Sequence, residues 1–529
     1  MSDPAVECVG LTYNFGSTRA VDGVDLRVEP GEVFGLLGPN GAGKTTAIRA
    51  ITTLLPVPAG MIRVFGRDVA KHKMAVRRLL GYVPQQLSAD SGLTGRENIA
   101  LFARVFDIPR KARPARVEEA LAIVDLTDVA DRLAKTYSGG MIRRLELAQA
   151  LVSSPRLLIL DEPTIGLDPI ARSSVWDRLT SARAETGMSV LVTTHYMDEA
   201  DQYCDRIAMM HRGQIHALGT PQELKSALPG GSPTLEDVFR AVAGGTWSRT
   251  GVTSAMSEAP AVLPPVSVDP FPGRPTWLIA LSRAQAMCVV EIQKIRHDRS
   301  EIYTRAIQPA LWLLVFGETF TRLRAIPTGK IPYLDYLAPG IIAQSAMFIA
   351  IFYGIMIIWE RDSGVLTKLL VTPTPRSALV AGKAFAAGVK SVIQAVVVLV
   401  LAALLGVSLT WNPLRLFGVL VAVVLGAAFF SCLSMSIAGI VLTRDRLMGI
   451  GQAITMPLFF ASNALYPVKL MPGWLQVVSH ANPLSYQVDA LRGLLLGTPA
   501  HLALDFLVLT VAAVAGIAAA SALMPRLAR

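Results

Sequence analysis

Residues 38–45 read Gly38-Pro39-Asn40-Gly41-Ala42-Gly43-Lys44-Thr45, directly after the apolar stretch Val33–Leu37. This fits the pattern GxxxxGK[ST], whose glycines let consecutive backbone N–H groups turn inward around phosphate oxygens. A lysine at the Lys44 position reaches the β- and γ-phosphates, and a hydroxyl at the Thr45 position takes one place on Mg²⁺. The residues expected to bind a nucleotide are Gly38, Asn40, Gly41, Gly43, Lys44, Thr45 and Thr46.

A second apolar stretch, Leu157–Leu160, ends in two carboxylates, Asp161 and Glu162. A buried strand that delivers acids at its carboxyl end places them beside a bound nucleotide. We expect Asp161 to hold Mg²⁺ through water, and Glu162 to orient and deprotonate the attacking water. The structural alternative is a plain strand followed by an acidic cap.

Four more motifs follow the order of a known family. Thr136-Tyr137-Ser138-Gly139-Gly140-Met141, which ends 20 residues before Asp161, resembles the LSGGQ signature of the ATP-binding cassette (ABC) family. The others are Gln85 in GYVPQQ, Gly166-Leu167-Asp168, and His195 in TTHYMDEAD. The resemblance covers about residues 5–240. It implies an ABC ATPase with an α/β P-loop fold that uses ATP and Mg²⁺.

The resemblance also implies roles for single residues. Gln85 would contact both the metal and the nucleotide, and His195 would contact the γ-phosphate during hydrolysis. Phe15 lies where the family has an aromatic residue that stacks on adenine, and Tyr13 is the second choice.

The signature departs from the family pattern at one position. Met141 stands where most members have Gln, whereas Ser138, Gly139 and Gly140 keep the part that faces phosphate. The stretch YSGGMIRRLELAQAL resembles the ATPases of daunorubicin-resistance-type exporters, which also favour Met there. In the family geometry the signature completes the site of a second chain. We therefore expect a homodimer, with a heterodimer of similar half-transporters as the alternative.

Charge is distributed unevenly along the 529 residues. Residues 301–529 contain 16 Lys or Arg and 8 Asp or Glu, whereas residues 1–300 contain 34 and 32. Runs of 20 or more residues without charge, enough for a helix to cross a bilayer, lie at 336–359, 391–414, 416–443, 447–468 and 506–525. With a shorter run at 306–317, they predict an all-α transmembrane domain of six helices. This pattern excludes a purely soluble enzyme and a disordered protein.

Two short motifs in this half resemble exporters of drugs, polysaccharides and lipids. Trp359-Glu360-Arg361-Asp362-Ser363-Gly364 resembles the loop after their second span. We expect Glu360, Arg361 and Gly364 to couple the spans to the ATPase by docking on Gln85 and the residues after it; a solvated turn is the alternative. Asn482-Pro483-Leu484-Ser485-Tyr486 resembles the signature before their last span.

Asp489 and Arg492 follow that signature three residues apart, so they could pair on one helical face. Their other predicted role is an anchor at the edge of a span.

We expect three regions along the chain. These are an ATPase domain at 1–240, a linker rich in Gly, Ser and Pro at 241–275, and a membrane domain at 276–529. The membrane domain would begin with an amphipathic helix at 277–300 on the cytosolic membrane surface. The start of the chain lacks the charged and then apolar pattern of a secretory signal. We therefore expect a multi-pass protein of the cytoplasmic membrane with both termini in the cytosol.

The basic residues are too diffuse to indicate nucleic acid and fit contact with anionic membrane lipid. Together these features predict ATP-driven export of a hydrophobic or amphipathic substrate, such as a drug, lipid or glycolipid. The alternative is a ligand-sensing or regulatory ATP-binding membrane protein without net transport. That protein would need a damaged Lys44, Glu162 or His195, and all three are present.

Overall fold

The computed structural model describes residues 3–229, 233–244, 247, 276–298, 300–323, 326–328 and 331–527. Most of the predicted linker at 241–275 lies outside these ranges. The chain divides into two compact units. The first contains residues 1–275 together with 363–374, and the second contains residues 276–362 and 375–527.

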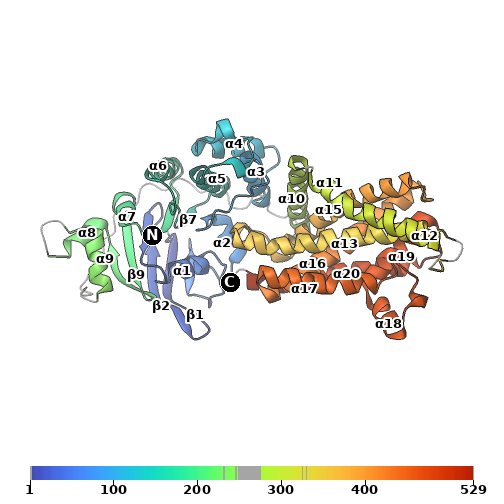
Figure 1. Cartoon of the computed structure of the whole chain (residues 1–529). Helices are drawn as coiled ribbons and strands as arrows, with labels where there is room; N and C mark the ends of the chain where they lie inside the picture. The colour runs from blue at the N-terminus through green and yellow to red at the C-terminus, as the bar shows by residue number, and fades with distance from the viewer. Residues whose placement is uncertain are drawn as a thin grey trace. The chain divides into compact units, whose positions relative to one another are not determined.

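The first unit is built on two sheets (Figure 1). The smaller one is antiparallel, in the order β2-β1-β4-β5. Its strands are β1 (Val6–Phe15), β2 (Thr18–Val28), β4 (Ile62–Val64) and β5 (Arg67–Asp68). The larger one has the order β10-β9-β3-β8-β7-β6, parallel except for the β9–β10 pair. Its strands are β3 (Val33–Leu37), β6 (Leu80–Val83), β7 (Leu157–Asp161), β8 (Ser189–Thr194), β9 (Arg206–His211) and β10 (Gln214–Gly219).

The central strands of the larger sheet are apolar runs. β3, β7 and β8 are buried along their whole length, as expected for parallel strands covered on both faces. In register, Leu37 lies opposite Thr194 and Asp161 lies opposite Thr193. The carboxyl ends of β3, β8 and β7 therefore lie at one edge of the sheet, where open α/β sheets bind ligands.

The helices of the first unit begin with polar caps in several places. Ser138 caps α5 by accepting a hydrogen bond from the backbone of Met141, and Asp168 caps α6 in the same way. The helices are α1 (Lys44–Ile51), α2 (Lys73–Leu79), α3 (Gly95–Val105), α4 (Arg113–Ile123), α5 (Gly139–Leu151), α6 (Pro169–Thr186), α7 (Met197–Tyr203), α8 (Pro221–Ser226), α9 (Leu235–Ala243) and α14 (Val365–Val371). Short 3₁₀ turns lie at η1 (Thr127–Val129) and η2 (Ala134–Thr136).

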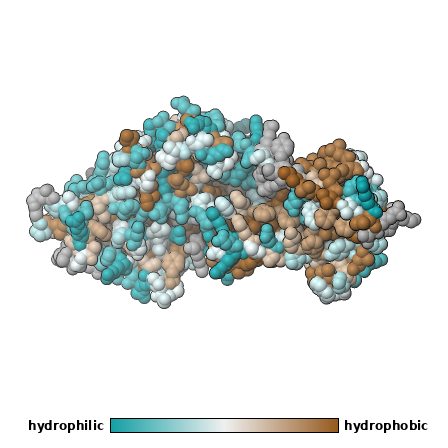
Figure 2. Space-filling view, viewed as in Figure 1, coloured by the Kyte–Doolittle hydropathy of each residue, from teal (hydrophilic) through white to brown (hydrophobic). Residues whose placement is uncertain are grey.

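The described part of the second unit is helical. Its elements are α10 (Thr276–His297), α11 (Ser300–Leu311), the π-helical η3 (Trp312–Gly317), α12 (Glu318–Leu323), α13 (Tyr333–Asp362), α15 (Arg376–Leu404), α16 (Pro413–Val441), α17 (Arg444–Phe460), η4 (Val468–Leu470), α18 (Gly473–Ala481), α19 (Pro483–Leu496) and α20 (Leu502–Leu527). Figure 2 shows hydrophobic side chains gathered on the surface of this helical unit.

Four helices among the described residues are long and apolar enough to cross a membrane: α13, α15, α16 and α20. The predicted count of six is therefore not confirmed. The run at 447–468 forms α17, which ends at Phe460 after 17 residues. The weak run at 306–317 is divided between α11 and η3.

Small residues allow close packing inside the second unit. A Cβ on Gly354 of α13 would lie 2.4 Å from the Cβ of Ser434 on α16, so these two helices approach closely. The predicted pair on α19 is confirmed, because Arg492 Nη1 lies 3.5 Å from Asp489 Oδ1. Arg492 also donates a hydrogen bond of 2.9 Å to the backbone oxygen of Asn463. The pair therefore fixes the chain after α17 against α19.

Candidate functional site

The phosphate-binding loop depends on its glycines. It leaves β3 at Leu37 and ends at the first turn of α1. Gly43 precedes α1 with φ of +106°, and a Cβ there would lie 2.4 Å from the backbone oxygen of Ala20. Gly41 has φ of +81°. Residues that have a side chain rarely adopt these positive φ angles, so both positions favour glycine.

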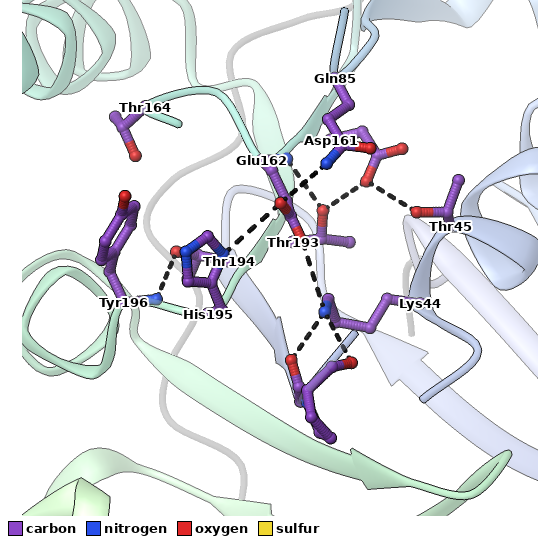
Figure 3. Close-up of polar contacts among 12 residues, drawn as sticks. Lys44, Thr45, Gln85, Asp161, Glu162, Thr164, Thr193, Thr194, His195 and Tyr196 are labelled. Carbon is purple, nitrogen blue, oxygen red and sulfur yellow. Dashed lines mark hydrogen bonds and ion pairs between the residues drawn. The ribbon is translucent and has the colours of Figure 1, made fainter. Parts of the chain in front are cut away.

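Lys44 is held at the centre of this loop. Its ammonium donates hydrogen bonds of 2.7 Å to the backbone oxygen of Gly38 and 3.2 Å to that of Pro39, and lies 3.4 Å from Glu162 Oε1 (Figure 3). The side chain is 4% exposed. A buried ammonium needs such partners, and its position at a helix N-terminus suits phosphate binding.

Asp161 lies between two hydroxyl groups. Its Oδ1 accepts a hydrogen bond of 2.6 Å from Thr193 and lies 3.4 Å from Thr45 Oγ1 (Figure 3). Burial raises the pKa of Asp161 and the neighbouring Glu162 raises it further, while the Thr193 hydrogen bond opposes this shift.

The oxygen atoms of Thr45 and Asp161 fit Mg²⁺, which prefers oxygen ligands and takes only one or two of them from the protein beside phosphate and water. Among the described residues, no cluster of three or more His, Cys, Asp or Glu side chains could hold a metal. A magnesium ion here would therefore depend on the nucleotide for further ligands.

The carboxylate of Glu162 lies near several of the other site residues. Its Oε2 accepts a hydrogen bond of 3.0 Å from Gln85 Nε2 and lies 3.5 Å from His195 Nδ1 (Figure 3). Its φ is +50°, a backbone angle uncommon outside glycine. The backbone N–H of Glu162 donates 3.0 Å bonds to the Thr193 side chain and backbone oxygen, which hold the residue in this conformation.

Other predicted residues lie outside this cluster. Ser138 and Gly139 are exposed where α5 begins. Phe15 is 42% exposed at the end of β1, and its ring meets that of Tyr13 edge to face with centroids 5.0 Å apart. Exposure leaves the Phe15 face available for stacking on an aromatic base.

The three predicted coupling residues have different surroundings. In the second unit, Glu360 pairs with Lys383, and Arg361 donates a hydrogen bond of 2.8 Å to the backbone oxygen of Leu442. In the first unit, a Cβ on Gly364 would lie 3.4 Å from the Cβ atoms of both Gln86 and Ser88. Gly364 and α14 thus lie against the segment after Gln85, whereas Glu360 and Arg361 join elements of the helical unit.

Sequence reasoning missed Thr193, which holds both Asp161 and the backbone of Glu162. It also missed Thr194, whose hydroxyl accepts a 3.0 Å bond from the backbone of Tyr196 and orders the turn that carries His195. The available signal was the pair of threonines before His195, because hydroxyls at a strand end commonly bond to neighbouring backbone.

Comparison with known proteins gives two matches along the chain. The pattern described as "ABC transporter" matches residues 21–165, and the pattern described as "ABC-2 type transporter" matches residues 283–496. The "Daunorubicin/doxorubicin resistance ATP-binding protein DrrA" of Streptomyces peucetius is 49% identical over 224 residues, which cover 42% of this chain and 68% of that protein.

Two further relatives match similar shares of the chain. The "Daunorubicin resistance ATP-binding protein DrrA3" of Streptomyces coeruleorubidus is 45% identical over 44% of this chain and 72% of its own length. The "Nod factor export ATP-binding protein I" of Paraburkholderia xenovorans is 42% identical over 42% of this chain and 73% of its own length.

Proposed function

This chain belongs to the ABC transporter family, with an ATPase domain ahead of an ABC-2 type membrane domain, and we propose that it uses ATP hydrolysis to export a hydrophobic or amphipathic compound. The observation that carries the proposal is the position of Glu162 within reach of Lys44, Gln85 and His195. A carboxylate in such a place can accept a proton from water.

The residues of the site take different parts in the proposed hydrolysis of ATP. Glu162 accepts the proton of the attacking water, and Gln85 and His195 orient that water and the carboxylate. Lys44 and the backbone N–H groups of residues 40–45 hold the β- and γ-phosphates. Mg²⁺, when bound through Thr45, Asp161 and Gln85, neutralises charge on the phosphates. Phe15 stacks on adenine.

The proposal includes a pair of chains. Ser138, Gly139 and Gly140 complete the nucleotide site of the second chain, which is a second copy or a similar half-transporter. The exposure of Ser138 and Gly139 supports this, because these residues are free to meet another surface. Two copies related by a two-fold axis would then form two composite sites.

The proposed domains are residues 1–240 and 276–529 with a linker at 241–275. We propose six spans in the cytoplasmic membrane and cytosolic termini, with α10 on the cytosolic surface. Four long apolar helices and the ABC-2 type match at residues 283–496 support a membrane-embedded domain. Membrane lipid is then a direct neighbour of the exposed apolar side chains.

The proposed substrate class follows the relatives, whose names refer to daunorubicin resistance and Nod factor export. A drug, a lipid or a glycolipid would each fit an apolar route through the spans. A sensor without net transport is the less favoured reading, because Lys44 and Glu162 lie in a geometry suited to hydrolysis.

The test is ATP-dependent uptake of daunorubicin into proteoliposomes that contain the full chain with its ATPase side outward. Uptake that requires ATP and is lost in Lys44→Ala supports export. ATP turnover without uptake of daunorubicin or of a lipid probe would contradict transport. Lys225→Ala provides a control, because Lys225 forms an ion pair with Asp201 outside the nucleotide site.

A further inference from the structure

The helix α14 buries its one charged side chain. Within the sequence Val365–Val371, only Lys368 is charged, and it is 3% exposed. Lysine side chains on a surface helix normally keep the ammonium in water. Removing that group from water is costly unless partners compensate. The surroundings of Lys368 therefore indicate a specific role.

The partners of Lys368 lie on α5 and α3 of the same compact unit. The ammonium donates hydrogen bonds to Gln149 Oε1 and, at 3.3 Å, to the backbone oxygen of Glu146. It also lies 5.0 Å from the ring centroid of Phe102, close enough for a cation–π contact. Lys368 is thus bonded to two points one turn apart on α5.

The helix α5 begins at the signature. Ser138 is its N-cap, so Lys368 is attached to the rigid helix whose first residues are proposed to contact the nucleotide of the second chain. A shift of that helix would reach Lys368 without passing through a flexible loop.

Glu146 also holds the segment that contains Gln85. Its carboxylate accepts hydrogen bonds from the backbone of Ser88 and, at 2.9 Å, from the Ser88 hydroxyl. Arg143 pairs with Glu146 at 2.8 Å and donates a 2.7 Å hydrogen bond to the backbone oxygen of Pro84. The side chains that fix this segment thus lie on the same turns of α5 that Lys368 contacts.

Gln149 extends the network to the end of the same segment. Its Nε2 donates a 3.0 Å hydrogen bond to Asn98 Oδ1, which also accepts 2.9 Å from the backbone of Asp90. Gln149 is 1% exposed and Asn98 is 1% exposed, so these bonds lie away from water. Low local dielectric strengthens such a buried network.

We propose that Lys368 is the positioning residue through which α14 follows both the signature helix and the segment that carries Gln85. The inference rests on the proposed function, because it concerns the transfer of ATP-driven movement to the spans. In the chain, α14 stands between α13 and α15, so its displacement is passed to two long apolar helices. Burial lowers the pKa of Lys368 to about 7; Arg143 adds to this shift and Glu146 opposes it.

The experiment uses the full chain in proteoliposomes with daunorubicin and compares Lys368→Met, Gln149→Met and the control Thr367→Val on the same helix. Transport per ATP hydrolysed should fall roughly 10-fold in the two test variants. The KM for ATP and the ATP turnover should change less than about twofold, because neither residue contacts the nucleotide site. Thr367→Val should keep the wild-type ratio.

Two outcomes would overturn the inference. One is an unchanged transport ratio in Lys368→Met, or in Gln149→Met if Lys368→Met does not fold. The other is a parallel loss of ATP turnover and thermal stability, which indicates a structural role only.

A second measurement separates this inference from the proposed function. ATP should change hydrogen exchange at 365–371 in the Glu162→Gln background, and Lys368→Met should remove that response. This result can be obtained even if daunorubicin is not transported. An ATP response that persists in Lys368→Met would contradict the inference.

Discussion

At one edge of the larger sheet in the ATPase unit, charged side chains from distant parts of the sequence meet around the candidate site, whereas the ion pairs of the helical unit lie along one helix or join two helices. Glu162 lies 3.4 Å from Lys44, although 118 positions separate the two residues. In the helical unit, Asp489 and Arg492 pair along one helix, and Glu291 of α10 pairs with Lys390 of α15 at 3.0 Å. The first arrangement suits chemistry on a ligand, and the second fixes helices against one another.

The largest expected effect tests the first half of this comparison. Glu162→Gln should lower ATP turnover by at least about 100-fold, because an amide cannot accept the proton of the attacking water. ATP binding should remain, since Lys44 and the glycine loop are unchanged. Steady-state hydrolysis and equilibrium ATP binding measure the two properties separately.

Glu185→Gln is the matched control, because Glu185 is exposed near the end of α6. Near-normal hydrolysis by Glu162→Gln would remove Glu162 from the role of base and weaken the contrast between the two units.

The next effect concerns the exposed signature. Lys44→Ala and Ser138→Arg should each abolish hydrolysis when purified alone. In a mixed dimer both lesions fall in one site and the other site is intact. An equal mixture coassembled from both chains should therefore recover about a quarter of the wild-type rate if sites act independently. Full activity of a wild-type monomer in a nanodisc would contradict composite sites.

The local pairs of the helical unit predict an effect on stability. Arg492 is 7% exposed, and its ring-facing guanidinium lies 3.8 Å from the centroid of Tyr336. Arg492→Ala removes buried hydrogen bonds to the backbone oxygens of Tyr336 and Asn463 and the cation beside half-exposed Asp489, so unfolding should become easier by about 2 kcal/mol. Thermal unfolding in detergent measures the change, with exposed Arg446→Ala as the control. An unchanged midpoint would mean that the pair does not stabilise the bundle.

The same contrast explains what the sequence could predict. Glycine spacing and an apolar strand ending in acids constrain the backbone locally, so the amino-acid pattern alone predicts that Lys44 and Glu162 lie together. Thr193 was missed because it lies in a strand buried on both faces, where hydroxyls do not interrupt the apolar pattern. Its role depends on register with β7, which is a tertiary property.

The count of six spans is not confirmed, and the sequence alone could not locate the helix ends. Absence of charge marks where a chain can enter a membrane, but it does not mark where a helix ends. In the run at 447–468 the helix stops at Phe460, before Ser462 and Asn463, whose polar groups bond to nearby backbone and to Asp489. Likewise the sequence could not predict the burial of Lys368, because only the fold places Gln149 beside it.

A smaller effect is expected for His195, which lies at the edge of the cluster with a side chain 36% exposed. His195→Ala should lower turnover about 10-fold and change ATP affinity less, because the imidazole orients groups in the transition state. The kcat and the KM for ATP, measured together, test this. Lower affinity with unchanged kcat would make His195 a binding contact only.

The smallest expected effect is a pH dependence of the packing of α14 that arises from the buried Lys368. Lys368 has an ordinary pKa of 10.5, lowered to about 7 by burial between α14 and α5. The charged groups acting on it are Glu146 and Arg143 of α5, and Phe102 of α3 faces it with a ring. Below pH 7 the buried state bears the full cost of the charge. Between pH 7 and 10.5, Lys368 binds more protons when α14 is separated from α5 than when it is packed against it. Rising pH therefore favours the packed (docked) state of α14.

From pH 7 to pH 8 the protection factor for hydrogen exchange at 365–371, corrected for intrinsic rates, should rise about fivefold. Lys368→Met should abolish this rise, and Thr367→Val should keep it. A wild-type protection factor that is flat or falls over this range would show that Lys368 stays charged when docked.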